Sequence, residues 1–140
     1  MTDVLIATDA PYVLDEVQAA LEGPDVTFRV TRWGKLVVPA CRLRAPDLVV
    51  LDLQIGNMGG IACTLSLRLE ESAGRLPHLP VMLLLDRTAD VFMARRSEAD
   101  GFLLKPLDAF RLRRASEALL AGETFMEGLP SDEGSPIGAQ

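Results

Sequence analysis

The sequence predicts an α/β protein built on a doubly wound, five-stranded parallel sheet with five helices. Apolar residues run without alternation between Asp47 and Asp52, which is typical of a strand buried on both faces at the centre of a parallel sheet. Five short apolar segments alternate along the chain with segments of helical periodicity, and this order favours βαβ units with right-handed crossovers. The 140 residues fit one domain with its own core.

The chain begins with a strand, a helix and a second strand. Residues 4–7 form a short apolar strand, and Pro11 opens a helix because an amide in the first helical turn has no partner to lose. Gly23 and Pro24 end that helix. Residues 26–30 have the β-branched and aromatic content of a strand, which we place at the edge of the sheet.

The expected second helix, over residues 33–44, contains two residues that weaken helices. Gly34 lies near its start, and Pro39 lies near its middle. A proline inside a helix removes a hydrogen bond and clashes with the preceding turn, at a cost of about 3 kcal/mol. We therefore expect this helix to start late or to kink.

The second half of the chain continues the alternation. A Gly- and Asn-rich loop at 53–60 leads to a helix over 61–71, in which Ile61, Leu65 and Leu69 are expected to face the sheet. The remaining expected elements are a strand at 81–85, a helix at 89–98, a strand at 101–104 and a helix at 108–121.

Residues 122–140 differ in composition from the rest of the chain. They are rich in Gly, Pro and Ser and hold four of the twenty acidic residues but none of the fourteen basic ones. Such a segment does not pack a core of its own. We expect a domain over 1–121 and an acidic tail over 122–140, with no output domain and with Phe125 and Met126 as the anchors of the tail.

The charge balance, the cysteine spacing and the hydropathy of the sequence argue against several classes of protein. The body of the chain is close to neutral and lacks the basic surface that nucleic-acid binding needs. Cys41 and Cys63 have no CxxC spacing and indicate buried thiols of a reducing compartment. No basic leader and no long apolar run precedes the first strand, so we expect a cytoplasmic protein without membrane insertion.

Three charged residues follow strands that end at one edge of the predicted sheet. Asp9 follows the first strand, Asp52 ends the central strand and Lys105 follows the fifth. In open α/β sheets, ligands bind outside the carboxyl ends of the strands. Taken alone, Asp52 favours the interpretation of an aspartate that merely ends a strand in solvent, and the charged residues after two other strands are what point to a functional site.

With these strand ends in this order and spacing, the chain resembles the receiver domains of bacterial two-component response regulators over residues 3–121. The resemblance rests on PDLVVLDL around Asp52, a loop closing on Gly60, an Ala-Asp-Gly turn at 99–101, the aromatic Phe102, and Lys105 followed by Pro106. It implies a flavodoxin-like sheet of order 2-1-3-4-5. It also implies a cis bond between Lys105 and Pro106.

The same resemblance implies a role for each charged residue. Asp52 would accept a phosphoryl group, and Lys105 would neutralise the charge of that group. Mg²⁺ would lie between Asp9, Asp52 and the backbone carbonyl of Gln54, because a carboxylate attacks phosphorus only when the transferring group is neutralised.

Several positions depart from the family pattern. Thr8 replaces one carboxylate of the acidic pair, which weakens the expected Mg²⁺ binding. Leu85 replaces the hydroxyl residue that contacts the phosphoryl oxygen, and Asp86 adds a carboxylate that would repel a phosphoryl dianion. The switch positions of this chain are Thr8, Leu85, Asp86 and Phe102.

Two functional hypotheses follow. In the first, the protein is a pseudo-receiver and not an enzyme: Asp9, Asp52 and Lys105 form a structural ion cluster, and the protein docks on another protein as a regulatory or accessory subunit. In the alternative, it is a working phospho-receiver that uses Asp52 and Mg²⁺. A phosphohydrolase resembling the haloacid dehalogenase family ranks below both, since it would need a second acid at Gln54.

The resemblance places the contact surface on the segments 89–98, 101–104 and 108–121. Arginine and aromatic residues, which are enriched at interface hot spots, gather there and predict an acidic protein partner. The partners compatible with the resemblance are a histidine kinase, a larger complex such as a respiratory NADH:quinone oxidoreductase, or a second copy in a homodimer. The expected surface residues are Phe92, Arg95, Arg96, Phe110, Arg111 and Arg114.

Overall fold

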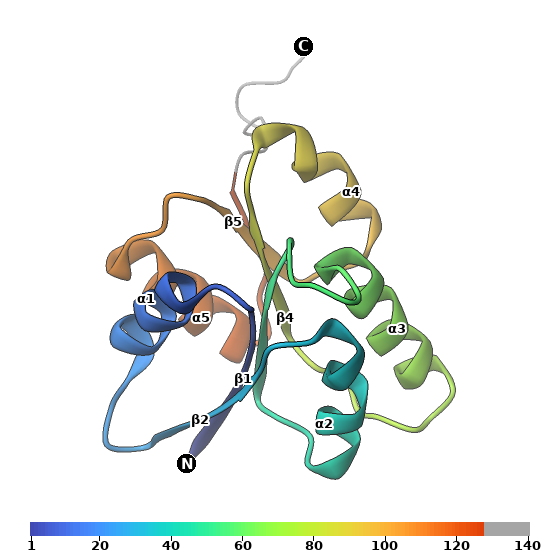
Figure 1. Cartoon of the computed structure of the whole chain (residues 1–140). Coiled ribbons are helices and arrows are strands. Elements are labelled where there is room, and N and C mark those ends of the chain that lie inside the picture. Colours follow the sequence, from blue (N-terminus) through green and yellow to red (C-terminus); the bar gives the residue numbers. More distant parts are fainter. Residues whose placement is uncertain (128–140) are drawn as a thin grey trace.

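The computed structural model describes residues 1–127, which form a six-stranded parallel sheet with helices on both faces (Figure 1). The strand order is β2-β1-β3-β4-β5-β6, so the predicted doubly wound sheet of order 2-1-3-4-5 is confirmed and one short strand is added beside β5. The strands are β1 (Thr2–Ala7), β2 (Val26–Thr31), β3 (Leu48–Asp52), β4 (Val81–Leu85), β5 (Gly101–Leu104) and β6 (Phe125–Met126).

Within residues 1–127, five helices cover the sheet, two on one face and three on the other (Figure 1). Helices α1 and α5 pack together on one face, and α2, α3 and α4 cover the other. Short 3₁₀ turns at Gly34–Leu36 and Thr88–Asp90 lead into α2 and α4. The helices are α1 (Pro11–Leu21), α2 (Val37–Leu43), α3 (Gly60–Ser72), α4 (Val91–Arg96) and α5 (Ala109–Leu120).

The sheet divides the core into two layers because successive side chains of a strand point to opposite faces. On β3, Leu48 and Val50 pack against α1 and α5, whereas Val49 and Leu51 pack against the other three helices. All four side chains are completely buried. This two-sided burial is the reason why the central strand shows no alternation in the sequence.

The second helix starts late, as the sequence predicts. Residues Gly34–Leu36 form a 3₁₀ turn, and α2 itself begins at Val37. Pro39 is therefore the third residue of the helix, where a missing amide removes no intrahelical hydrogen bond. The helix is short but is not interrupted.

The prediction of which α3 residues face the sheet is wrong. Leu65 and Leu69 are 45% and 68% exposed, and Ile61 is only half-buried. The buried residues of α3 are instead Gly60, Cys63, Thr64, Leu67 and Glu70. The physical reason is that two polar side chains on the inner face find partners: Thr64 donates to the carbonyl of Gly60 over 2.9 Å, and Glu70 is paired with arginines.

The start of the predicted tail is part of the sheet. Phe125–Met126 forms β6, parallel to β5, in agreement with the expectation that these two residues anchor the segment. Gly101 permits this pairing, because a Cβ at that position would lie 2.7 Å from the carbonyl oxygen of Phe125. The rest of the predicted tail, 128–140, lies outside the described residues.

Within residues 1–127, no helix is long and apolar enough to cross a membrane.

Candidate functional site at the carboxyl edge of the sheet

The carboxyl ends of β3 and β5 bring two of the three predicted charged residues, Asp52 and Lys105, into contact, whereas Asp9 accepts a hydrogen bond from the amide of Gly56. Asp52 is the last residue of β3, and its side chain is only 2% exposed. Thr8 follows β1 directly, and Lys105 follows β5. Because β1 and β4 are the neighbours of β3, residues that follow β1 and β4 lie beside Asp52.

Both carboxylate oxygens of Asp52 accept hydrogen bonds from the protein. The Thr8 hydroxyl donates to Oδ2 over 2.8 Å, and the Lys105 ammonium donates to Oδ1 over 2.8 Å. The backbone amide of Gln54 also donates to Oδ1, over 3.3 Å. The hydroxyl of Thr8 in turn accepts from the amide of Ala10 at 3.1 Å, which fixes its orientation toward Asp52. The buried charge is thus satisfied by this chain alone.

Lys105 joins two carboxylates. Its ammonium lies 2.8 Å from Asp52 Oδ1 and 3.0 Å from Asp86 Oδ1. Burial acts to lower the pKa of Lys105, but the hydrogen bonds that its ammonium donates to the two carboxylates outweigh this effect, and the pKa is raised. Lys105 is therefore a fixed positive charge. The bond between Lys105 and Pro106 is cis, as the resemblance implies.

The oxygen atoms at the carboxyl edge of the sheet are of the chemical type that binds Mg²⁺. Asp9 and Asp52 offer carboxylates and Gln54 a backbone carbonyl, and Mg²⁺ commonly binds through one or two carboxylates plus waters. Asp9 Oδ2, however, accepts from the amide of Gly56 at 3.0 Å. No group of three or more His, Cys, Asp or Glu within residues 1–127 is placed to hold a metal. The donor set therefore fits Mg²⁺ in type, with few ligands.

The substituted switch positions lie where the sequence places them. Leu85 ends β4 and is fully buried, and Phe102 is fully buried on β5, so neither offers a polar group to the edge. Asp86 uses Oδ1 for Lys105, while its Oδ2 is buried without a hydrogen-bond partner among residues 1–127. The site thus holds an extra carboxylate that is not fully satisfied.

The exposed surface of α4 and α5 carries most of the predicted partner-face residues. Phe92 and Phe110 are each 63% exposed. The guanidinium of Arg96 lies 5.5 Å from the ring centre of Phe92, and that of Arg114 lies 5.6 Å from the ring centre of Phe110. Arg95 is exposed on the same helix as Phe92. These side chains combine apolar area with positive charge.

Arg111 differs from its predicted role on this surface. Its guanidinium pairs with Glu127 and donates to the carbonyls of Leu104 and Pro106 over 2.7 and 2.8 Å. It also donates to Asp108 Oδ2, 3.1 Å away. Hydrogen bonding to Glu127 raises the pKa of Arg111. Arg111 therefore holds β6 and the start of α5 in place and is largely occupied by intramolecular contacts.

Two contacts of the site were missed from the sequence. The first is the hydrogen bond from Thr8 to Asp52, which a hydroxyl beside a strand-end carboxylate on the neighbouring strand could have indicated. The second is the bond from Gly56 to Asp9, for which the sequence carries no signal because the donor is a backbone amide.

Comparisons with known proteins agree with this geometry. A family model described as the response regulator receiver domain matches residues 4–117. The chain is 26% identical over 122 residues to the protein PilH of Pseudomonas aeruginosa, covering 87% of this chain and 100% of that protein. It is 30% identical over 105 residues to the DNA-binding response regulator MtrA of Mycolicibacterium smegmatis, covering 74% of this chain and 43% of that protein.

A solved structure shares both sequence and fold. The receiver domain of a signal transduction histidine kinase from Syntrophus aciditrophicus is 27% identical, covers 87% of this chain and 92% of its own, and superposes with a TM-score of 0.75.

Proposed function

The chain belongs to the family of response regulator receiver domains, and from that premise we propose that it is a pseudo-receiver. In this proposal it is a cytoplasmic regulatory or accessory protein that docks on another protein, with weak or absent phosphorylation at Asp52. Receiver domains in general are signalling modules that interact with histidine kinases and other proteins, so a signalling role without turnover of a small substrate fits the family.

The observation that carries the proposal is the closed set of contacts around Asp52. Its two oxygens are held by Thr8 and Lys105, and Lys105 is held a second time by Asp86. To attack phosphorus, an oxygen of Asp52 must lose its donor, and Lys105 must turn toward the incoming group. Each rearrangement breaks a charge-assisted hydrogen bond in a buried place, which opposes the reaction.

The surroundings of Lys105 add a second obstacle. The hollow that opens beside it is lined by three carboxylates, those of Asp15, Glu16 and Asp86. A phosphoryl donor brings negative charge into this hollow, and like charges repel at short range. Leu85, in turn, has no hydroxyl with which to bind the transferred group.

Weak binding of Mg²⁺ is part of the same proposal. Asp9, Asp52 and the carbonyl of Gln54 would hold the ion, which supplies charge neutralisation for phosphoryl transfer when bound. Thr8 contributes a neutral hydroxyl where a third carboxylate would stand, and the site therefore attracts a divalent cation less strongly.

The alternative, a working phospho-receiver, is favoured by one observation: Asp52 and Lys105 keep a 2.8 Å contact at the carboxyl edge of the sheet. In that reaction, Asp52 forms a new bond to phosphorus while the bond from phosphorus to the donor oxygen breaks. With acetyl phosphate as donor, the leaving group is acetate, and the product is an acyl phosphate on Asp52.

The deciding experiment is incubation of the full chain with acetyl phosphate and Mg²⁺, followed by intact-mass and Phos-tag analysis beside Asp52→Asn. We expect no adduct, or a trace, in the wild-type chain, with an unchanged circular dichroism spectrum. A substantial adduct that is absent from Asp52→Asn would establish the alternative and end the proposal of weak phosphorylation.

Docking is proposed to use the basic aromatic face, defined here as Phe92, Arg95, Arg96, Phe110 and Arg114. The three arginines have no ion pair within residues 1–127, so their charge is available to an acidic partner. The proposed partners are a histidine kinase or a larger assembly such as a respiratory NADH:quinone oxidoreductase.

Charge reversal tests this face. Arg95, Arg96 and Arg114 changed together to Glu should abolish co-purification with the partner from cells that carry the tagged chain. The matched control reverses Arg32, Lys35 and Arg113, three exposed cations outside the face, and should leave co-purification unchanged. Equal recovery of the partner with both triple variants would contradict the assignment.

A further inference from the structure

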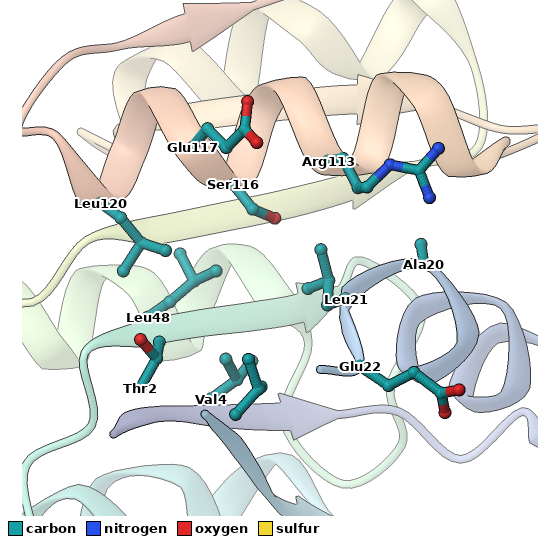
Figure 2. A pocket seen from close by; sticks show the side chains of 11 residues that line it. Thr2, Val4, Ala20, Leu21, Glu22, Leu48, Arg113, Ser116, Glu117 and Leu120 are labelled. Atoms are coloured by element: carbon teal, nitrogen blue, oxygen red, sulfur yellow. The ribbon is translucent and has the colours of Figure 1, made fainter. Parts of the chain in front are cut away.

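A second cavity lies at the opposite edge of the sheet from Asp52, between the ends of α1 and α5 (Figure 2). Its volume is about 240 Å³. It opens over the first residues of β1, β2 and β3, and no charged residue from the Asp52 edge or the basic aromatic face lines it. The lining residues are Thr2, Val4, Ala20, Leu21, Glu22, Val26, Leu48, Arg113, Ser116, Glu117 and Leu120.

The walls of this cavity are apolar and rigidly placed. Val4 and Leu48 form its floor from β1 and β3 and are 2% and 0% exposed. Leu21, at the end of α1, is half-buried, and Leu120, at the end of α5, is 45% exposed at the opening. An apolar ligand that enters therefore removes apolar surface from water on two helices and on the sheet.

One hydroxyl stands out in this apolar setting. Ser116 is 4% exposed, and its Oγ is buried without a hydrogen-bond partner within residues 1–127. Figure 2 shows Ser116 and Leu120 directed from α5 into the space above Leu48. A buried hydroxyl without a partner costs free energy, which a ligand can recover by supplying the missing hydrogen bond.

The other buried hydroxyls of the helical layers show that this arrangement is particular to Ser116. Thr64 on α3 donates to the carbonyl of Gly60 over 2.9 Å, and Ser97 at the end of α4 donates to the carbonyl of Ala94 over 2.7 Å. Both hydroxyls are thus satisfied by the preceding helical turn, the usual solution for such side chains. Within residues 1–127, Ser116 instead has no such partner, although the residue lines the cavity.

Charge at the opening selects against ionic ligands. Glu22, Arg113 and Glu117 are exposed residues around the mouth, with one positive and two negative charges among them. A carboxylate ligand would meet the like charges of Glu22 and Glu117, and the apolar floor of Val4 and Leu48 offers a cation no charged partner. A neutral molecule avoids both penalties.

We propose that this cavity is a binding site for a small neutral amphiphile, an apolar body the size of one ring or a short branched chain that carries a single hydrogen-bonding group for Ser116. The volume supports this size, because an apolar cavity of about 150 Å³ accepts benzene and the cavity here measures about 240 Å³. The site is independent of Asp52 and of the proposed function.

The test is a titration of the isotope-labelled full chain with benzyl alcohol, followed by two-dimensional NMR. Saturable shifts should be confined to residues near Val4, Ala20, Leu48 and Leu120. Ser116→Ala should weaken binding about tenfold, the size of one hydrogen bond, while the control Ser66→Ala on α3 should bind as the wild type. Toluene, which lacks the hydroxyl, should bind wild type and Ser116→Ala equally.

Three outcomes would overturn the proposal. They are shifts that grow linearly without saturation, shifts spread over other surfaces, and equal affinity of the wild type and Ser116→Ala for benzyl alcohol. The thermal unfolding of Ser116→Ala gives an independent measurement. If the Oγ of Ser116 lacks a partner, the variant should be at least as stable as the wild type, and a clear loss of stability would contradict the geometry.

Discussion

Lys105 is the residue on which the behaviour of the carboxyl edge depends, because it is shared between Asp52 and Asp86. Removal of Asp86 leaves the ammonium bound to Asp52 alone and takes one negative charge from the hollow beside it. One unit charge at this range changes an interaction by about 1–4 kcal/mol. Asp86→Ala should therefore increase the rate of adduct formation from acetyl phosphate by about tenfold or more, measured by intact mass.

The control for Asp86→Ala is Asp15→Ala, which removes a carboxylate from the same hollow without touching Lys105. It should give a smaller increase. If Asp86→Ala and the wild type are equally unreactive while both remain folded, the carboxylate of Asp86 is not what restrains Asp52.

Thr8 offers a test of the cation site at the same scale. Its hydroxyl is buried and bound to Asp52, so Thr8→Asp places two carboxylates together without a proton between them. The variant should unfold at a lower temperature in the presence of a chelator, because like charges in a buried place repel. Mg²⁺ should restore most of the loss and should raise the wild-type unfolding temperature by much less.

The control variant Thr8→Asn distinguishes the effect of the added charge in Thr8→Asp from the effect of the changed side-chain shape. It keeps a polar side chain of similar size but adds no charge, so Mg²⁺ should raise its unfolding temperature no more than it does for the wild type. An equal Mg²⁺ response in all three proteins would show that position 8 does not limit binding of the cation.

At the scale of the elements, the position of the short strand β6 depends more on the side chain of the following residue, Glu127, than on the two residues of the strand itself. Glu127 pairs with Arg111 and accepts from the amide of Leu104 at 2.9 Å, which joins the end of β6 to β5 and α5. Glu127→Ala should destabilise the protein by about 1.5–3 kcal/mol, the usual range for hydrogen bonds to a charged group. Hydrogen exchange should quicken at Leu104 and not at Leu51 in the central strand.

The ion pairs of Glu70, which join α2 and α3, predict how the stability of the protein changes at acidic pH. Glu70 on α3 is bound by Arg42 on α2, over 2.7 Å, and by Arg75, over 2.8 Å. These hydrogen bonds lower the pKa of Glu70 from 4.5 to about 2. The stabilisation is therefore complete above pH 4.5 and is lost as the pH falls from 4.5 toward 2.

Urea unfolding of the wild type and Glu70→Gln over this pH range checks the sign. The wild type should be the more stable protein at pH 7, and the two should converge below the ordinary pKa of Glu70 as its folded form is protonated. Glu22→Gln, at an exposed position without an ion pair within residues 1–127, is the control and should follow the wild type. A difference that persists unchanged at low pH would contradict the pairing.

The elements also show which parts of the fold were predictable. Strands at 81–85 and 101–104 were predicted with their observed bounds, because continuous apolar runs between turn residues leave little choice. The inner face of α3 was not, because periodicity counts leucines and cannot foresee that Glu70 is buried by two arginines. The strand β6 was missed because its two residues form a strand only beside β5.

The candidate site was likewise predictable from the sequence only in part. The convergence of Asp52 and Lys105 was predictable from strand order alone, since the carboxyl ends of parallel strands share an edge. Arg111 was misplaced on the outer surface because its partner Glu127 belongs to a segment that composition describes as a tail. The unpaired hydroxyl of Ser116 could not be predicted, since serine is common in helices and only packing reveals the missing partner.

At the scale of the whole molecule, charge distribution predicts the oligomeric state. The formal net charge is −6, but the basic aromatic face carries Arg95 and Arg96 beside the exposed Phe92 on α4, and Arg114 beside the exposed Phe110 on α5. A twofold dimer through this face would set each patch against itself, and three arginines would meet three. We therefore expect a monomer at low salt, measured by sedimentation velocity over a range of protein concentrations.

Added salt and mutation then distinguish two reasons for a monomer: repulsion between the arginines of two copies, and the lack of any attraction between their apolar side chains. Salt screens exposed charges, so a weak self-association driven by Phe92 and Phe110 should appear only at high ionic strength, and Phe92→Ser with Phe110→Ser should remove it. Binding to an acidic partner has the opposite dependence and should weaken as salt is added. A dimer that is stable at low salt and lost in the serine variant would reverse this assignment, because the face would then be self-complementary despite its arginines.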